Sequence, residues 1–262
     1  MEYWTRQEKP NPDLLWNLPE QKTGLVTIIG GNASNFSAEI KLTEFLNTLN
    51  LKTVRLCLPD SLKNKLPPLP EIVFAPATDS GSFKKSPELA HVTDSADATL
   101  ISGDLSKNSA TAIAIAEVIK ASSCPIVLAR DSVELVASEM AQLLEQQNLI
   151  VTTTFLGLQK ILRSIYYPKM LLLSMPLTQA IEVLHKFTLS YPCTILTFHE
   201  GQIIIARSGE ITTIPIKTTT YSPITLMTGE LAAKITTLCA WNPNQLLTNV
   251  IAAIHWDGTT NF

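Results

Sequence analysis

Short apolar runs alternate with amphipathic segments along the chain up to residue 190, and this alternation is the feature that most constrains the fold. The runs have the length of strands and are apolar almost throughout, which is typical of strands buried on both faces of a parallel sheet. The segments between them space their apolar residues as one face of a helix does. The predicted strands are 25–29, 51–58, 72–75, 98–101, 125–128, 149–151 and 170–174, and the predicted helices are 34–50, 108–121, 132–147 and 177–190. The pattern therefore predicts an α/β fold whose mostly parallel sheet is covered by helices on both faces.

The pattern changes in the last third of the chain. Three closely spaced strands, 194–198, 202–206 and 210–216, predict an antiparallel meander at one edge of the sheet, and helices are predicted at 229–240 and 243–256. Residues 1–23 contain three prolines and scattered charges, so we expect an irregular lead-in that packs through its tryptophans. Residues 24–262 are expected to form a single domain.

The composition excludes several classes of protein. The chain has 262 residues with 20 Lys and Arg against 23 Asp and Glu, so it lacks the basic surface that nucleic acid or an anionic membrane requires. No apolar run reaches the roughly 18 residues of a membrane helix. The four cysteines lie far apart, which argues against a disulfide framework and against a zinc site. We expect a soluble, cytoplasmic protein.

The mean hydropathy is +0.18, and only 16% of the residues are charged. This balance suggests that some apolar surface is buried between subunits, and it predicts a homo-oligomer.

The turn Gly30-Gly31-Asn32 follows a predicted strand and precedes a predicted helix. Ligands of open α/β sheets bind beyond the carboxyl ends of the strands, where backbone amides at a helix start can hold an anion. The turn matches neither G-x-G-x-x-G nor G-x-x-x-x-G-K-[ST], so it predicts no dinucleotide or P-loop site. The alternative is a tight strand-to-helix turn that binds nothing.

The segment Thr228-Gly229-Glu230 begins a predicted helix with a carboxylate in its first turn. Amides at such a helix start can hold a phosphate, while the carboxylate can take a proton from a nearby hydroxyl. The alternative is that Thr228 caps the helix and that Glu230 stabilises it by its charge.

Two further carboxylates follow apolar strands. Asp104 and Asp131 could each bind a substrate or hydrated magnesium, and the alternative for both is a helix cap. The four histidines have no metal-ligand spacing and no nucleophile beside them, so we predict no metal site and no catalytic histidine.

The order of these pieces resembles the ribokinase-like superfamily and, within it, the carbohydrate kinase-like family of ADP-dependent NAD(P)H-hydrate dehydratases. The resemblance covers about 22–258 and lies mainly in the layout. Leu25-Val-Thr-Ile-Ile-Gly-Gly-Asn32 is similar to the family's opening strand and its V-I-G-G-S turn, and 96–103 is similar to A-D-A-L-V-I-G-P-G. Residues 125–131 resemble P-V-V-L-D-A-D, and Thr228-Gly229-Glu230 stands where the family has S-G-D.

The resemblance implies a three-layer α/β/α sandwich, a function and a set of site residues. The implied reaction is the repair of hydrated nicotinamide nucleotides with ADP or ATP, with or without Mg²⁺. The implied roles are catalysis for Glu230, nucleotide binding for Thr228, Gly229 and Gly201, and binding of NAD(P)H hydrate for Gly30, Gly31, Asn32 and Asp131.

The chain departs from the family pattern at the same predicted site. Glu230 stands where the family has aspartate, and an ångström of misplacement of a catalytic group can cost about 100-fold in rate. The glycines before it are replaced by bulky residues, and the turn P-H-P-G-E loses its histidine and its acid. The departures are Leu226 and Met227 for glycine, Phe198 for a strand-end lysine, Ala129 for the first aspartate of D-A-D, and 153–157 for P-H-P-G-E.

Three hypotheses remain open at this point. The chain is a divergent dehydratase of this family, in which Glu230 handles the proton. Alternatively it is an inactive pseudoenzyme or a nucleotide- or metabolite-binding module, because several departures fall on one site. The third possibility is a small-molecule kinase for a sugar or a vitamin precursor, in which Glu230 deprotonates a substrate hydroxyl.

Overall fold

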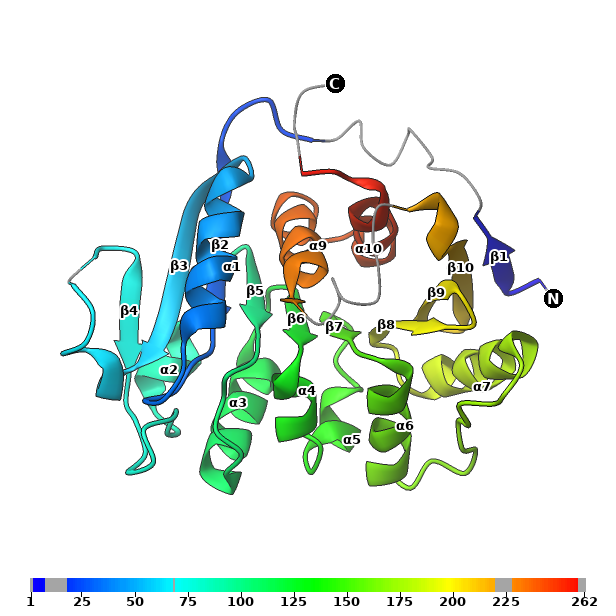
Figure 1. Ribbon diagram of the computed structural model, residues 1–262, viewed down its shortest axis with the longest axis horizontal. Helices are drawn as coiled ribbons and strands as arrows, with labels where there is room; N and C mark the ends of the chain where they lie inside the picture. Colours follow the sequence, from blue (N-terminus) through cyan, green and yellow to red (C-terminus); the bar gives the residue numbers. More distant parts are fainter. Residues whose placement is uncertain (1, 8–17, 68, 220–227, 259–262) are drawn as a thin grey trace.

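A computed structural model describes residues 2–7, 18–67, 69–219 and 228–258 of the chain. Their strands form one ten-stranded sheet in the order β1-β10-β9-β8-β7-β6-β5-β2-β3-β4 (Figure 1). The strands are β1 Trp4–Arg6, β2 Thr23–Ile29, β3 Leu51–Pro59, β4 Ile72–Ala75, β5 Ala98–Ile101, β6 Ile126–Ala129, β7 Leu149–Thr152, β8 Thr194–His199, β9 Gln202–Arg207 and β10 Glu210–Pro215.

Helices cover both faces of this sheet, so the molecule has three layers (Figure 1). On one face lie α1 Ser37–Thr48, α9 Glu230–Trp241 and α10 Leu246–His255. On the other face lie α2 Pro87–His91, α3 Ser109–Ala121, α4 Asp131–Leu135, α5 Met140–Leu143, α6 Phe155–Ser164 and α7 Leu177–Ser190. Two short 3₁₀ helices, η2 Asp60–Leu62 and η3 Ile216–Thr218, follow β3 and β10. The predicted three-layer α/β/α sandwich is confirmed.

The sheet is parallel except around β9, which pairs antiparallel with both β8 and β10. This confirms the predicted meander at one edge. The edge does not end at β10, because β1 adds to it in parallel, with Trp4 opposite Ile211. The indole Nε1 of Trp4 donates to Thr213 Oγ1 at 3.0 Å. The prediction that residues 1–23 are irregular is therefore wrong at Trp4–Arg6, because the unpaired edge of β10 offers a partner to any extended segment that reaches it.

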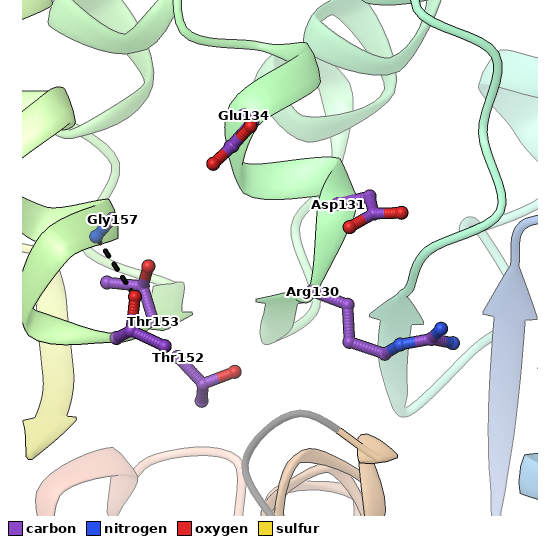
Figure 2. A pocket seen from close by; sticks show the side chains of 7 residues that line it. Arg130, Asp131, Glu134, Thr152, Thr153 and Gly157 are labelled. Atoms are coloured by element: carbon purple, nitrogen blue, oxygen red, sulfur yellow. Dashed lines mark hydrogen bonds between the residues drawn. The ribbon is translucent and has the colours of Figure 1, made fainter. Parts of the chain in front are cut away.

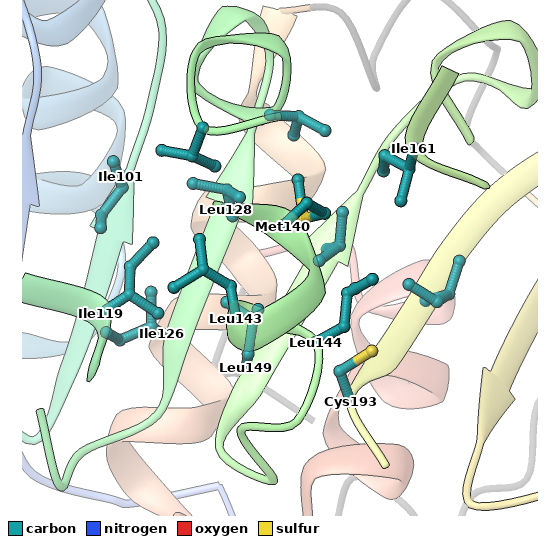
Figure 3. Close-up of a cluster of buried hydrophobic side chains, with 14 of the residues drawn as sticks. Ile101, Ile119, Ile126, Leu128, Met140, Leu143, Leu144, Leu149, Ile161 and Cys193 are labelled. Carbon is teal, nitrogen blue, oxygen red and sulfur yellow. The ribbon is translucent and has the colours of Figure 1, made fainter. Parts of the chain in front are cut away.

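The core consists of two apolar clusters, one on each face of the sheet. Successive residues of the central strands belong alternately to the two clusters: Ile126 and Leu128 of β6 face α3 to α6, whereas Val127 and Ala129 face α9. This explains the continuous apolar runs in the sequence, since both faces of each strand are buried. Figure 3 shows the cluster under α3 to α6, where Met140, Leu143 and Leu144 of the α5 region cover the ends of β6 and β7.

The strand predicted at 170–174 is absent. This segment links α6 to α7 without pairing to the sheet, and only Leu171 of its apolar residues is fully buried. Leu172 and Leu173 are 49% and 63% exposed. The apolar run misled the prediction because a run of this length indicates burial, and here it is largely exposed.

Two helix predictions also need correction. The helix predicted at 132–147 is broken into α4 and α5, with turns between them. Helix α6 was not predicted at all, yet Thr154 is its N-cap, with Oγ1 accepting from Gly157 N at 3.0 Å. A capping threonine followed by apolar residues at helical spacing was the signal for this helix.

Within the described ranges, no helix is both long and apolar enough to cross a bilayer. The four cysteines are free thiols.

Candidate functional site

The order of the strands reverses between β2 and β5. From β2 the chain continues outward through β3 and β4, and it then returns to place β5, β6 and β7 on the other side of β2. Open α/β sheets bind their ligands at such a switch point, beyond the carboxyl ends of the strands. We call the edge of the sheet where these parallel strands end the carboxyl edge.

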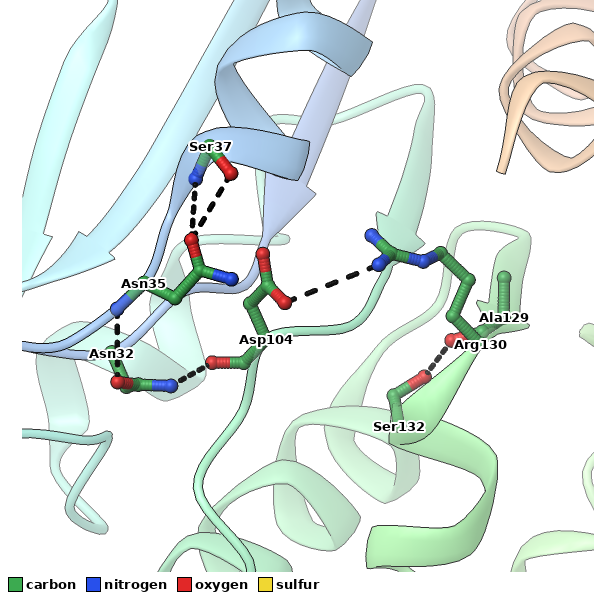
Figure 4. Close-up of polar contacts among 7 residues, drawn as sticks. All are labelled: Asn32, Asn35, Ser37, Asp104, Ala129, Arg130 and Ser132. Atoms are coloured by element: carbon green, nitrogen blue, oxygen red, sulfur yellow. Dashed lines mark hydrogen bonds and ion pairs between the residues drawn. The ribbon is translucent and has the colours of Figure 1, made fainter. Parts of the chain in front are cut away.

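The predicted turn Gly30-Gly31-Asn32 lies at this switch point. Gly31 N donates to Gly103 O at 3.4 Å, and the Asn32 side-chain amide donates to Asp104 O, so the turn is tied to the loop after β5 (Figure 4). Asn32 Oδ1 also accepts from Ser34 N at 2.8 Å. The side chain of Asn32 therefore closes its own loops, and its predicted contact with a substrate stays a prediction.

Three ionisable side chains meet beneath this turn, and we call Glu39, Asp104 and Arg130 the switch-point cluster. Glu39 comes from α1, and Asp104 and Arg130 follow β5 and β6. Asp104 Oδ1 lies 4.0 Å from Arg130 Nη2, and the two side chains are only 11% and 18% exposed (Figure 4). Glu39 is fully buried against Gly30, where a Cβ atom would lie 2.7 Å from its Cγ. The glycine at position 30 thus makes room for the Glu39 side chain.

Burial gives Glu39 unusual acid chemistry. Desolvation, followed by the negative charge of Asp104, raises its pKa to about 8, although the charge of Arg130 opposes the shift. Neither carboxyl oxygen of Glu39 has a hydrogen-bond partner among the described residues, nor do Asp104 Oδ2 and Arg130 Nη1. Four unsatisfied polar atoms in one buried place are costly, and a buried acid with a shifted pKa is a candidate functional group.

The first turn of α9 adjoins this cluster. Gly229 precedes the helix in a left-handed conformation with φ of 87°. A Cβ atom at Gly229 would lie 3.2 Å from Leu42 of α1 and 3.4 Å from Arg130 Cδ. Glu230 is the first residue of α9 and is exposed, as is Thr228 before it. The fold therefore brings the predicted catalytic segment next to Arg130. The replacements Leu226 and Met227 lie outside the described residues.

A pocket of about 280 Å³ opens beside Arg130 at the carboxyl ends of β6 and β7. Figure 2 shows its wall, with the hydroxyls of Thr152 and Thr153 on one side and Glu134 on the other. The Arg130 guanidinium points away from these threonines, toward the loop after β5. The pocket is lined by Arg130, Asp131, Glu134, Thr152, Thr153, Thr154 and Gly157. The predicted substrate residue Asp131 thus lines a pocket, with its side chain exposed.

Gly201 lies in the turn between β8 and β9 and lines a different pocket, also of about 280 Å³. Thr154 lines both pockets, so the two adjoin at neighbouring strand ends. The second pocket is walled by Phe198 and by His199, whose ring stacks on Phe155 with 3.9 Å between centroids. His199 Nε2 lies 2.6 Å from Met175 O. The imidazole is thus held between Phe155 and Met175, and the prediction that no histidine is catalytic stays a prediction.

Sequence reasoning missed Glu39 and Arg130. Glu39 falls on the buried stripe of α1 at helical spacing from Leu42 and Leu46, so an acid on an apolar face was the available signal. Arg130 follows a strand that is buried on both faces, and its position in the sequence pattern does not indicate that it binds a ligand. Among the described residues, no group of three His, Cys, Asp or Glu side chains is placed to hold a metal ion.

Comparison with known proteins identifies the fold. No protein-family model matches the chain, and no curated protein matches it in sequence. A ribokinase-like superfamily protein of Enterococcus faecalis superposes with a TM-score of 0.66 at 16% identity, over 97% of this chain and 86% of that one. An ADP/ATP-dependent NAD(P)H-hydrate dehydratase of Bacillus subtilis, co-crystallised with ATP and Mg²⁺, gives 0.61 at 14% identity, over 92% and 83%.

A hydroxyethylthiazole kinase of Pyrococcus horikoshii is also similar, with a TM-score of 0.57 at 14% identity over 92% of this chain and 80% of that one. The chain thus has the ribokinase-like fold, as the resemblance in its sequence layout predicts. Identities this low establish the fold alone, and the neighbours include both kinases and a dehydratase.

Proposed function

We propose that the chain is a divergent ADP- or ATP-dependent NAD(P)H-hydrate dehydratase. The observation that carries this proposal is the position of Glu230 at the start of α9, where Gly229 brings the helix end against Arg130 at the carboxyl edge. An acid at a positive helix end is the arrangement that the predicted chemistry requires, because one group moves a proton while the other holds a phosphate.

The described residues fit an anion at this place. Gly229 lacks the Cβ that would fill the space against Leu42 and Arg130, and Arg130 Nη1 is a buried donor without a partner among the described residues. The nucleotide, when bound, would supply a phosphate that assists departure of the C6 hydroxyl of the hydrated nicotinamide. Glu230 would move the proton at that hydroxyl, and Thr228 and Gly229 would hold the phosphate through their amides.

The direct test is dehydration of NADH hydrate with ADP, ATP and Mg²⁺, followed by the rise of NADH absorbance. Glu230→Gln removes the acid while keeping the shape of an exposed side chain, so turnover should be lost and the fold retained. Glu210→Gln, which changes another exposed acid, this one on β10, is the matched control and should behave as the unsubstituted chain. Equal turnover by Glu230→Gln would contradict the assignment of Glu230.

A second candidate is a nucleotide- or metabolite-binding protein without turnover. The Asp104–Arg130 pair favours it, because it places an arginine side chain at the switch point, where open α/β sheets bind their ligands. This candidate predicts saturable binding of ADP or ATP by calorimetry together with no dehydration and no phosphate transfer. Turnover of the hydrate that depends on Glu230 would exclude it.

A further inference from the structure

The positive charge of Arg130 is only partly compensated by neighbouring acceptors. Its nearest acidic oxygen, Asp104 Oδ1, is 4.0 Å from Nη2, which is the outer limit for an ion pair. Its Nη1 is buried and has no hydrogen-bond partner among the described residues. Because an unmade hydrogen bond to a buried charged donor is costly, the guanidinium gains from any acceptor that reaches it.

The Arg130 side chain lies between the start of α9 and the loop after β5, with its guanidinium beside that loop. A Cβ atom at Gly103 would lie 3.1 Å from Arg130 Cζ, and one at Gly229 would lie 3.4 Å from Arg130 Cδ. An anion at the first turn of α9 would therefore lie beside the aliphatic part of the Arg130 side chain. Phe198, at the end of β8, provides no cation there. We propose that Arg130 binds the anionic group of the ligand at the first turn of α9, and that the carboxyl pair Glu39 and Asp104 governs its release. This inference rests on the proposed function of the same site.

The carboxyl pair can act in this way because no other charged side chain of the described helices α1 and α9 faces it. Glu39 faces Asp104 from the loop after β5 and Arg130 from the end of β6. The other charged side chains of α1, Lys41 and Glu44, are exposed. On the facing helix α9, Glu230 is exposed and Lys234 donates to Trp256 O at 2.8 Å.

Protonation of Glu39 sets how strongly Arg130 is held. With Glu39 neutral, only Asp104 attracts the guanidinium, and an anionic ligand competes with one carboxylate. With Glu39 ionised, two buried carboxylates attract it, and the ligand competes less well. By the same coupling, Arg130 lowers the pKa of Glu39, so drawing Arg130 toward a ligand raises that pKa and takes up a proton.

Sulfate is the probe that tests this inference, because it does not titrate between pH 7 and 9.5 and carries neither base nor ribose. Arg130→Gln should weaken sulfate binding about 10- to 100-fold by calorimetry, and Arg130→Lys should lose less. Affinity of the unsubstituted chain should fall above pH 8, by at most about tenfold per pH unit. Glu39→Gln, which mimics the neutral acid, should remove that fall, whereas Glu44→Gln on the exposed face of α1 should keep it.

Three outcomes overturn the inference: no saturable sulfate binding, equal binding by Arg130→Gln, or an unchanged pH dependence in a folded Glu39→Gln protein. If Glu39→Gln does not fold, the ¹³C carboxyl signal of Glu39 in the unsubstituted chain replaces it, and its pKa must rise on addition of sulfate. The proposed function fails separately. If the sulfate results hold and the hydrate is never dehydrated, Arg130 binds anions in a protein without that activity; if dehydration proceeds normally in Arg130→Gln, only the role of Arg130 is wrong.

Discussion

Asp104 and Arg130 face each other across 4.0 Å from neighbouring strand ends, and both have a left-handed backbone with φ of 59°. A non-glycine residue in this region costs about 1–2 kcal/mol. Two such residues on either side of one ion pair are kept only where the surrounding structure fixes them, and strained residues of this kind gather at functional sites. Ser132 Oγ helps to fix these strand ends, because it donates to Ile101 O at 3.0 Å and so joins the ends of β5 and β6.

Stability should depend on pH through Glu39. Its carboxyl holds a proton up to a pKa of about 8 in the folded chain but loses it near the ordinary value of 4.5 when unfolded. The folded state therefore binds more protons between these values, and the free energy of unfolding should fall as pH rises from about 4.5 to 8, at no more than about 1.4 kcal/mol per pH unit. Unfolding of the native chain and of Glu39→Gln by guanidinium chloride from pH 5 to 9 measures this free energy. The variant should lack the decline, and parallel curves for both proteins would contradict it.

Gly229 should tolerate substitution less well than Gly201. Both have positive φ, 87° and 70°, so alanine strains the backbone at either position by about 1–2 kcal/mol. Only Gly229 also lacks space, since its Cβ would press on Leu42 and Arg130, whereas nothing lies within 4 Å of a Cβ at Gly201. Gly229→Ala should therefore lower the melting temperature more than Gly201→Ala. Equal losses would show that α9 can shift away from Arg130.

Three of the four thiols should not react in the folded protein. Burial raises the pKa of Cys57, Cys193 and Cys239 to about 12, and the thiolate is the reactive form. A disulfide reagent at pH 8 should thus modify no thiol other than Cys124, which is partly exposed, and should modify all four in denaturant. Native Cys124→Ser should show no reaction, and a second reactive thiol would mean that the sheet opens locally.

A homo-oligomer remains the prediction from hydropathy, and light scattering measures it. The structure adds one place to examine: Tyr166, Met170 and Leu173 are 93%, 57% and 63% exposed in the segment between α6 and α7. If this segment lies between subunits, Leu173→Ser should favour the monomer, while Leu69→Ser, which alters an apolar side chain that is 50% exposed elsewhere, should not. A monomeric native chain would contradict the prediction.

The sheet was largely predictable because strands buried on both faces appear in the sequence as continuous apolar runs. Each residue of β6 touches one helical layer or the other, so none is free to be polar. The same rule failed at 170–174, where an apolar run carries no information about whether a neighbouring strand exists to pair with it. The opposite error occurred at β1, where no strand was predicted. Trp4–Arg6 is a strand only because β10 offers an unpaired edge.

The candidate site was predictable only as a location. The turn at 30–32 and the start of α9 both follow from their glycines and from the rule that ligands bind at strand ends. The switch-point cluster did not follow, because its chemistry comes from contact between three separate elements. The sequence shows Glu39 only as an acid on the apolar face of a helix, and its pKa is raised only because the fold buries it and places Asp104 beside it.

The pairing of β1 with β10 sets a delay in the biosynthesis of this protein. Trp4 and its partner Thr213 are 209 residues apart, and the strand between them and the core, β9, also comes late in the chain. At 5–20 residues per second a ribosome needs roughly 10–40 s to add that many residues. During this interval β1 has no strand to join, and the nascent chain is exposed to chaperones and proteases before this edge of the sheet can form.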